Sequence, residues 1–540
     1  MAPRAKDYIK SLPHDLTAAV VVFLVALPLC LGVALASGAP PLSGIIAGIA
    51  GGLVVGLASR SHLSVSGPAA GLTAIVLAAI ATIGSFEGFL VAVVLGGVLQ
   101  VLLGFCRAGV IGDYVPNSVI KGMLAAIGLI LILNQVPHLL GDDTHFETDE
   151  RVKQDKGNIF FNFAHAFTNI NSTALLIGGL CLAFHVGWEK IIEKRKGFIR
   201  FIPAPLLIVI TGVGINTAFM NVKPAVALSG EHLVRIPVAT SANQFFSFFT
   251  TPDWSQLFNT DVLIIAVTLA LVASLESLLS IEAVDDLDPY QRVTPTNREL
   301  KAQGLGNIIS GLVGGLPVTS VIVRSSANVN AGAKTKLSTI YHGILLLLSF
   351  AFIPFVLNMI PKASLAAILI FTGYKLAKPA LFRAFYKKGW DQFLPFIITI
   401  TAILVADLLK GVIIGIGAGL FFVMRSNFRT AVFVVNDANK YLFRLRKDVS
   451  FLNKPIIKNK LELVPADSYV LIDASRADFI DKDIVETIED FMLHAPLKNI
   501  QVELKRSHYK EQGFSDKLPP GKNRRLVRTH EKVLKETANN

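Results

Sequence analysis

One arginine lies inside a long stretch that otherwise has no charged side chain. Arg324 is the only ionised residue between positions 304 and 333, and Gly314, Gly315 and Pro317 come shortly before it. A continuous membrane helix would not tolerate those three residues unless nearby protein satisfied the freed backbone groups. Because an ionisable residue at membrane depth is costly, its default interpretation is functional. We therefore interpret this stretch as a broken membrane helix built around an anion. An arginine that extends from a helix end to the membrane interface is the alternative.

A second interrupted stretch, HLSVSGPAAGLTAIV at 62–76, has the same character, with Gly67, Pro68 and Gly71 inside an apolar run. Short broken helices at matching positions of two inverted halves indicate a binding site near the middle of the membrane. The amino termini of such helices present free N–H groups and a positive dipole end, which favours an anion. The competing interpretation is that the glycines only permit close helix packing.

Glu276 is a lone carboxylate within the apolar run LIIAVTLALVASLESLLSI. At this depth it is a candidate for proton exchange. The hypothesis is that protonation of Glu276 accompanies anion binding. Ser280 lies one helical turn further along the same face, so the pair could instead supply oxygen ligands to Na⁺. A static ion pair between Glu276 and Arg324 is the third interpretation.

The elements that must position these residues are membrane helices. The chain has 540 residues, of which 52% are apolar and only 17% charged, and apolar runs recur from about Leu16 to Met424. Runs of this length and composition indicate a polytopic all-α membrane protein, with a first span that is retained rather than cleaved. The fourteen predicted spans are 16–36, 42–58, 67–83, 88–105, 116–136, 172–188, 203–220, 261–281, 303–316, 318–330, 338–360, 363–378, 392–409 and 411–427.

The loops between these spans differ in charge. Lys and Arg are about three times as frequent in the even-to-odd loops as in the others, which predicts that both termini are cytoplasmic. The expected location is a cell membrane, most simply a bacterial inner membrane. We divide the chain into a cytoplasmic segment 1–15, a membrane domain 16–427, a soluble domain 432–505 and a basic disordered tail 506–540. The soluble domain is predicted to be α/β because short strand-like and helical stretches alternate there.

Several classes of function are disfavoured. Cys30, Cys106 and Cys181 lie in or beside apolar segments, which predicts neither a disulfide framework nor a metal site. No GxxxxGK[ST] motif is present, so ATP is not expected to drive the protein. No basic and aromatic module for nucleic acid is visible. No nucleophile, base and orienting group converge in a hydrophilic domain, so an enzyme is not expected, and H⁺ or Na⁺ are the only cofactor-like partners.

Three stretches carry a family resemblance: RAGVIGDYVPNSVIKGM (107–123), the SGPAAG motif of the third span, and the block from Glu276 to Gly343. They resemble the SulP anion permeases. The resemblance implies a seven-plus-seven inverted repeat with a core domain (spans 1–4 and 8–11), a gate domain (spans 5–7 and 12–14) and dimer contact through the gate. It also implies that residues 432–505 are a short STAS-like domain. Leu29 stands where eukaryotic sulfate carriers of the family usually have glutamine.

The same resemblance implies the positions of the binding residues. The residues implied to surround the anion are Ala69, Ala70, Gly71, Ser320, Val321 and Ile322, with Arg324 behind it. In the family, the position of Glu276 is acidic and adjoins the anion site. In cyanobacterial bicarbonate carriers, Asp and Thr at comparable positions offer ligands to Na⁺, as Glu276 and Ser280 could here.

The expected function is secondary active transport of an inorganic anion by alternating access, sulfate-type and proton-coupled. The alternatives are a sodium-coupled bicarbonate symporter and an anion channel or exchanger for chloride or dicarboxylates. A nucleobase–proton symporter shares the architecture but tends to place a carboxylate in span 10, where this chain has Arg324.

Overall fold

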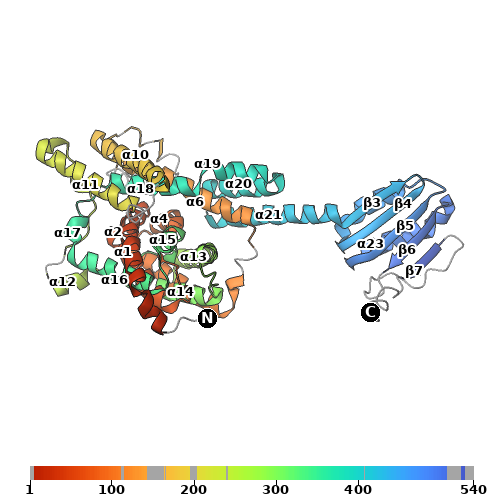
Figure 1. Cartoon of the computed structure of the whole chain (residues 1–540), viewed down its shortest axis with the longest axis horizontal. Helices are drawn as coiled ribbons and strands as arrows, with labels where there is room; N and C mark the ends of the chain where they lie inside the picture. Colours follow the sequence, from red (N-terminus) through yellow and green to blue (C-terminus); the bar gives the residue numbers. More distant parts are fainter. Residues whose placement is uncertain are drawn as a thin grey trace. The chain divides into compact units, whose positions relative to one another are not determined.

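The computed structural model describes residues 5–110, 115–142, 163–164, 166–168, 170–194, 203–238, 241–406, 408–506 and 524–528. It forms two compact units, Met1–Ile416 and Gly417–Asn540. The boundary falls inside one helix, α21 (Leu408–Ala431). The first unit is helical, and the second is built on a sheet (Figure 1).

The helices of the first unit match the predicted spans in order. In the first half they are α1 (Ala5–Ala36), α2 (Pro41–Ala50), α3 (Gly56–Ala58), α4 (Thr73–Ile83), α5 (Phe86–Phe105), α6 (Asn117–Leu140), α10 (Ser172–Lys194) and α11 (Ala204–Val222). In the second half they are α13 (Thr260–Leu287), α14 (Thr296–Leu312), α15 (Ile322–Asn330), α16 (Leu337–Phe352), α18 (Lys362–Leu376), α20 (Trp390–Val405) and α21. Short helices α12 (Ala242–Ser247), α17 (Pro354–Leu357) and α19 (Pro379–Lys387) lie in the connections.

Eight of the described helices are long and apolar enough to cross a membrane, and four more apolar helices are shorter, at 10–17 residues. The structure confirms the predicted fold class, a polytopic helical membrane protein with a small α/β unit. Local sequence signals explain where the helices begin. The side chain of Ser85 accepts a hydrogen bond from the Gly88 N–H at the start of α5, and the side chain of Asn259 does the same for Asp261 at α13.

Two predicted bounds were wrong. Span 9 was placed at 303–316, but α14 begins a full turn and more earlier, at Thr296, because its polar first turns are buried by neighbouring helices rather than left outside. Span 11 was placed at 338–360, but α16 ends at Phe352. Pro354 follows immediately and opens the separate turn α17, since proline cannot continue the preceding helix.

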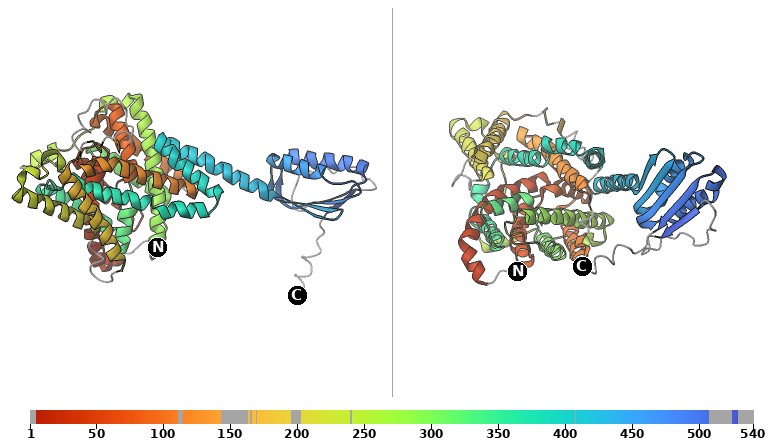
Figure 2. Two further views of the ribbon diagram at one scale, coloured as in Figure 1. Left: turned by 90° about the horizontal axis from the view of Figure 1, so that it is seen from above. Right: turned by 45° about the vertical axis from the view of Figure 1, so that its right-hand side comes forward.

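The third member of each half begins with a strand, which positions the site. Strands β1 (Ser66–Pro68) and β2 (Val318–Ser320) pair antiparallel, with Ser66 opposite Ser320 and Pro68 opposite Val318. Helix α5 packs against α13 and α14, while α6 packs against α18 and α20. The strand pair lies among helices, since β1 contacts α2 and β2 contacts α13 and α14. Figure 2 shows the helices of this unit from above and in a view turned by 45°.

One glycine makes the close approach of the second span to β1 possible. The second span contains a π-helical turn, η1 (Gly51–Val55), and a Cβ added to Gly51 would lie 2.4 Å from the Ser66 carbonyl oxygen. A side chain there would push η1 and β1 apart. Glycine is thus required at this position for packing, as small residues are at many membrane-helix contacts.

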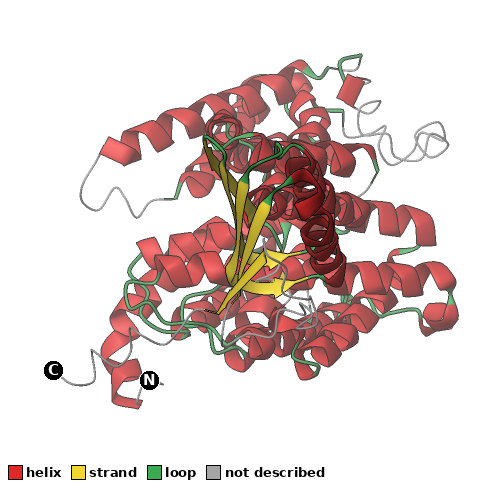
Figure 3. Ribbon diagram, turned by 90° about the vertical axis from the view of Figure 1, so that its right-hand side faces the viewer, coloured by secondary structure: helices red, strands yellow, loops and turns green. Residues whose placement is uncertain are grey.

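The second unit has a five-stranded sheet, visible in yellow in Figure 3. Its strands in spatial order are β3 (Val432–Asp437), β4 (Lys440–Val449), β5 (Tyr469–Ile480), β6 (Gln501–Arg506) and β7 (Arg524–Arg528). The first pair is an antiparallel hairpin and the remaining pairs are parallel. Helices α22 (Lys454–Glu462) and α23 (Lys482–His494) provide the crossovers. Alternate residues of β5, Val470, Ile472 and Ala474, are buried in a core shared with α23.

The prediction that 506–540 is a disordered tail was wrong for residues 524–528. These residues form β7, which pairs in parallel with β6, as Leu504 lies opposite Leu526. The sequence RRLVR has more charged than apolar residues, so composition suggested a solvated segment. Strand pairing uses backbone groups, which every residue other than proline supplies regardless of its side chain, so an edge strand can form from such a sequence.

Asp473 on β5 has a pKa that its hydrogen bonds and neighbouring charges shift. Burial alone would raise its pKa, but hydrogen bonds from Ser475 and the charges of Lys505 and Arg444 outweigh burial, so the pKa of Asp473 lies below its usual value. Ser475 donates to the carboxylate at 3.2 Å from its N–H and 2.5 Å from its hydroxyl. The ionised form therefore stabilises the fold above the unfolded-state pKa of about 3.9, and this contribution is lost as pH falls through the folded-state pKa.

We therefore expect Asp473→Asn to lower the stability of the second unit at pH 7, and this effect to disappear as the pH falls through the lowered folded-state pKa of Asp473, because the native carboxylate is then also neutral. The measurement is protease resistance of the second unit in the intact chain as a function of pH. Asp483→Asn is the control, because Asp483 pairs with Lys454 at 3.4 Å on the surface. A pH-independent effect of Asp473→Asn would contradict the electrostatic explanation.

Candidate functional site

Two short helices begin side by side within the first unit. On one side, β1 leads through the 3-10 turn η2 (Ala70–Leu72) into α4, and on the other, β2 leads directly into α15. The amino termini of η2 and α15 leave the antiparallel pair at opposite ends, but they still lie near each other because the two strands pair over only three residues. The structure thus brings together the two interrupted stretches that the sequence singled out.

Some of the predicted binding groups already have protein partners. The Ser320 N–H donates to Ser277 Oγ at 3.3 Å, and its hydroxyl is 2.6 Å from Ser64 Oγ. The Val321 N–H donates to the Val65 carbonyl at 3.0 Å. The groups that remain for a ligand on this side are the next N–H groups of α15, beginning with Ile322, because a helix's first N–H groups have no intrahelical partner.

On the other side, Ala69 and Gly71 are buried while Ala70 is partly exposed. The chain leaves strand geometry at Ala69 and turns into η2, so the N–H groups of Ala70 and Gly71 open that helix. Ile322 and Val323 are also partly exposed. The partly exposed residues at the two helix starts are therefore apolar ones, and the polar groups available there are backbone N–H donors. Such donors suit an anion that has a low charge density or a planar or tetrahedral set of oxygens.

Arg324 lies in the first turn of α15 and is only 1% exposed. Its Nη2 donates to the Pro68 carbonyl at 3.5 Å, while Nε and Nη1 have no hydrogen-bond partner. A Cβ added to Gly67 would lie 2.1 Å from Nη1, so the guanidinium packs directly against β1. Burying unpaired guanidinium donors is costly, and a nearby negative charge would offset that cost. The alternative that Arg324 extends to the membrane interface is therefore wrong.

Glu276 approaches the site from α13. A Cβ added to Gly71 would lie 2.7 Å from Glu276 Oε1, which places the carboxylate against the start of η2. Its Oε2 is buried and has no hydrogen-bond partner. Glu276 and Arg324 approach different glycines of the β1–η2 segment, and no ion pair joins them in the part of the chain that the structure describes, so the interpretation as a static pair is not supported. Ser280, one turn further along α13, is buried.

A chain of buried amides supports the strand pair from behind. Asn307 of α14 accepts from the Val318 N–H at 2.5 Å and donates to the Val318 carbonyl at 3.0 Å, so it pairs with β2 as a further strand would. Asn307 also donates to Gln100 of α5 at 2.6 Å. One turn earlier on α14, Gln303 donates to Ser66 Oγ on β1 at 2.8 Å. The amides of α14 therefore hold both strands.

Sequence reasoning missed these amides because it followed charges. Gln303 and Asn307 are four residues apart, which places them on one face of a helix, and they are flanked by Gly304 and Gly306. Two amides on one face of a glycine-rich membrane helix must find hydrogen-bond partners. This pattern in the sequence could have predicted that Gln303 and Asn307 form buried hydrogen bonds. No signal marked Gln100, whose partner lies far away in the sequence.

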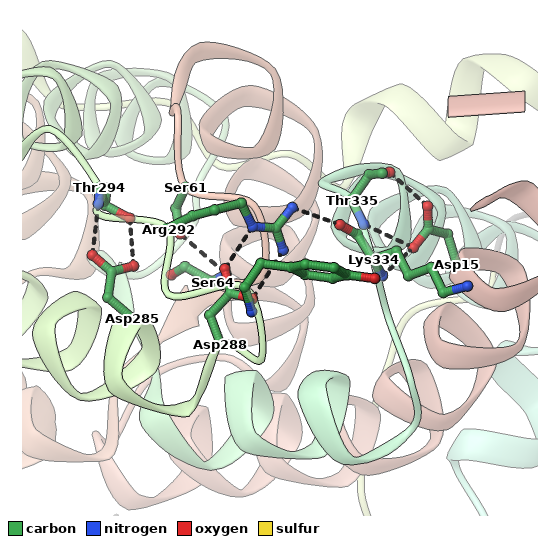
Figure 4. Close-up of polar contacts among 10 residues, drawn as sticks. Asp15, Ser61, Ser64, Asp285, Asp288, Arg292, Thr294, Lys334 and Thr335 are labelled. Atoms are coloured by element: carbon green, nitrogen blue, oxygen red, sulfur yellow. Dashed lines mark hydrogen bonds and ion pairs between the residues drawn. The ribbon is translucent and has the colours of Figure 1, made fainter. Parts of the chain in front are cut away.

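A second polar network surrounds Asp15 and Arg292 (Figure 4). Asp15 of α1 accepts from the N–H groups of Lys334 and Thr335, at 2.7 and 3.0 Å, and from the Thr335 hydroxyl at 2.5 Å. Arg292 donates to both oxygens of Asp288, at 2.6 and 3.1 Å, and to the Lys334 carbonyl at 2.9 Å. This network fixes the segment that follows α15 to the start of α1 and to the loop after α13.

Two of the charged residues that follow α13 are buried rather than solvated. Asp288 is 4% exposed and Glu299 is 1% exposed. Glu299 accepts from Ser59 and, at 2.8 Å, from Gln303, so it continues the same amide chain that reaches β1. Ser59, which is distant in the sequence, satisfies Glu299, while Asp288 pairs with Arg292 four residues further along the chain.

Taken together, the arrangement can hold an anion by backbone donors and a buried positive charge. It shows no arrangement of a nucleophile with a base. No cluster of three or more His, Cys, Asp or Glu side chains suited to a metal ion occurs among the described residues.

Several known proteins are similar to this chain. Residues 12–399 match the family model described as "Sulfate permease family". The chain is 28% identical to the "Putative sulfate transporter YvdB" of Bacillus subtilis (strain 168), covering 79% of this chain and 77% of that protein. It is 24% identical to the "Bicarbonate transporter BicA" of Picosynechococcus sp. (strain ATCC 27264 / PCC 7002 / PR-6), covering 77% and 70%.

Two solved structures share the fold. "The overall structure of SLC26A9" aligns with a TM-score of 0.72 at 16% identity, covering 93% of this chain and 86% of that one. "The transmembrane domain of a cyanobacterium bicarbonate transporter BicA" aligns with a TM-score of 0.61 at 21% identity, covering 76% and 97%. At these identities the alignments show the fold alone.

Gly67→Ala tests the packing of Arg324 against β1. The added Cβ would lie 2.1 Å from Nη1, so the guanidinium must move away from the site. Overpacking of this kind costs about 1–3 kcal/mol. We expect an inorganic oxyanion such as sulfate to raise the melting temperature of the purified wild-type protein, and the variant to lose most of that shift. Gly179→Ala on α10 is the control, because its added Cβ meets nothing within 4 Å. Undiminished stabilisation of Gly67→Ala by sulfate would show that the placement of Arg324 does not matter for anion binding.

Proposed function

The chain belongs to the sulfate permease family, and on that premise we propose that it is a secondary active transporter of inorganic anions that works by alternating access. The single observation that carries the proposal is the β1–β2 pair, which holds two helix amino termini together beside the buried guanidinium of Arg324. Backbone donors at helix starts bind anions without any covalent chemistry. A site of this kind suits transport, and the family is one of transporters rather than enzymes.

Sulfate is the substrate that we favour. Relatives that align over most of this chain are named as sulfate transporters. Convergent N–H donors from two helices can satisfy several oxygens of a tetrahedral oxyanion, and the positive charge of Arg324 offsets the loss of its hydration. We propose Ala69, Ala70, Gly71, Ser320, Val321 and Ile322 as the residues that surround the anion, with Arg324 behind them.

The position of Glu276 supports coupling of anion transport to protons. Its carboxylate lies against Gly71, so an ionised Glu276 and an anion at the start of η2 would repel each other at short range in a poorly solvated site. Protonation removes that repulsion and would make anion binding and proton binding favour each other. The proton would then enter and leave with the anion.

A sodium-coupled bicarbonate symporter is the second candidate. Glu276 and Ser280 lie one turn apart on α13, and both offer oxygen atoms of the kind that Na⁺ accepts. A relative covering 77% of this chain is named as a bicarbonate transporter. An anion channel or an exchanger for chloride or dicarboxylates is distinguished from both by whether uptake saturates and depends on a gradient.

The chain is a multi-pass membrane protein. We propose that both termini are cytoplasmic, in a bacterial inner membrane, because the loops on the amino-terminal face carry the excess of Lys and Arg. The network around Asp15 and Arg292 lies on that face. We further propose a homodimer, and a STAS-like role for residues 432–505 in folding or dimer contact.

Glu276→Gln removes the titrating group while keeping its size. We expect this variant to lose acid-stimulated sulfate uptake in proteoliposomes but to keep its fold, because Gln can occupy the same space as a protonated Glu. The measurement is sulfate uptake as a function of external pH, over a range from about 5 to 8 that brackets physiological pH. Glu282→Gln on the exposed side of α13 is the matched control. Acid stimulation that persists in Glu276→Gln would refute proton coupling through this residue.

Counterflow in proteoliposomes decides the substrate and the coupling ion together. Labelled sulfate and labelled bicarbonate are each supplied with and without Na⁺ and with and without a proton gradient. We expect saturable sulfate uptake that an inward proton gradient increases and that Na⁺ leaves unchanged. Bicarbonate uptake that requires Na⁺ would favour the second candidate, and flux that does not saturate would favour a channel.

A further inference from the structure

His342 of α16 is a fully buried side chain that the proposed transport site does not yet include. Neither of its ring nitrogens has a hydrogen-bond partner within the part of the chain that the structure describes. Leaving a buried polar group unpaired is costly, so native structures keep such a group where it has a role or meets a bound water. His342 therefore has a hydrogen-bonding capacity that the protein can use.

The imidazole of His342 shares a buried space with the guanidinium of Arg324, whose positive charge acts on it. A Cβ added to Gly48 of α2 would lie 2.8 Å from Leu346, which is one turn beyond His342 on α16. A Cβ added to Gly67 would lie 2.1 Å from Arg324 Nη1 and 3.7 Å from the Cα of Gly48. Glycines at these two positions let α16 and the guanidinium approach each other.

The helix that carries His342 is fixed to the segments around β1. The hydroxyl of Thr339, three residues earlier on α16, donates to the Ser64 carbonyl at 3.0 Å. A Cβ added to Gly52 would lie 2.6 Å from the Cα of Gly343, so α16 lies tightly against η1. Helix α1 packs against both α15 and α16. The backbone that presents the imidazole is therefore held in place relative to β1.

The guanidinium of Arg324, by contrast, is held by few contacts. Its one hydrogen bond among the described residues, from Nη2 to the Pro68 carbonyl, is long at 3.5 Å, and Nε and Nη1 have no partner. The Cys30 thiol lies next to the same guanidinium, but a thiol is only a weak acceptor. A neutral imidazole nitrogen is a much better acceptor for the donors that remain.

We propose that His342 is a positioning residue for the transported anion: its neutral imidazole accepts a hydrogen bond from the Arg324 guanidinium and holds the guanidinium behind the anion site. Two positive charges buried side by side would repel each other, so the neutral imidazole is the form that fits beside Arg324. The hydrogen bond forms directly after a side-chain rotation, or through one water that also meets Cys30. Both routes require an acceptor at position 342.

A neutral acceptor suits an anion site better than a carboxylate would. A carboxylate beside Arg324 would pair with the guanidinium and cancel the positive charge that a bound anion needs. An imidazole satisfies a donor of the guanidinium and leaves its full charge to the anion. This inference rests on the proposed function, because His342 acts on the anion only through Arg324.

The test is thermal unfolding of the purified full-length protein in detergent as a function of sulfate concentration. We expect His342→Leu to weaken the apparent sulfate affinity at least about tenfold, because a hydrogen bond of a charged group is lost. His342→Met is a second apolar variant, whose flexible side chain can fill the space if leucine packs badly. His342→Gln should retain most of the affinity, because its amide oxygen is again an acceptor.

His185→Leu on α10 is the matched control. His185 is also a buried histidine of a membrane helix, and its Nδ1 also has no hydrogen-bond partner, but its ring packs on Phe371 with the centroids 4.0 Å apart. This variant should change the melting temperature without sulfate but leave the sulfate affinity as in the wild type. A purely structural role of His342 would produce the same behaviour in His342→Leu.

Arg324→Gln separates a failure of this inference from a failure of the proposed function. If sulfate does not stabilise the wild type, or stabilises Arg324→Gln equally well, the proposed anion site is wrong and the role of His342 is wrong with it. If Arg324→Gln loses affinity while His342→Leu and His342→Met keep it, only the inference about His342 is overturned. An affinity loss in His342→Gln as large as in His342→Leu would also overturn it, because the acceptor would not matter.

Discussion

The antiparallel pairing of β1 with β2 is the interaction on which the rest of the site depends. Only three residues of each strand take part, yet they join two halves of the chain and place two helix starts at one point. Within a membrane, backbone groups that leave a helix must find protein partners. Pairing the two breaks with each other solves that problem for both at once. Asn307 completes it by satisfying Val318 from the other side.

The two charged side chains of the site, Arg324 and Glu276, do not pair with each other in this way. Arg324 and Glu276 each leave a buried atom without a partner, and each approaches the β1–η2 segment at a glycine. Structural charges in cores are normally paired or hydrogen-bonded. The surrounding polar side chains, by contrast, are largely engaged: Gln303 donates to Ser66 and Glu299, and Asn307 donates to Gln100. Rigid polar support next to unsatisfied charge is typical of a pre-organised binding site.

Much of this arrangement could be predicted from the sequence, and the reasons are physical. The lengths of the apolar runs predict the positions of the helices, and the glycines and prolines around Pro68 and Pro317 predict where two helices are interrupted. Both signals are local in the sequence. The burial of Glu299 and Asp288 could not be predicted, since their partners, Ser59 and Arg292, become neighbours only through folding or loop geometry. Strand β7 was missed because backbone pairing leaves no trace in composition.

The distance along the chain between β1 and β2 has a consequence for biosynthesis. Ser66 and its partner Ser320 are separated by about 250 residues. At ribosomal rates of about 5–20 residues per second, roughly 12–50 seconds pass before the second strand is made. During that interval the backbone N–H and C=O groups of β1 have no partner strand, and unpaired backbone groups are costly in lipid. The nascent amino-terminal half must therefore be shielded, by the insertion machinery or by water, until its counterpart emerges.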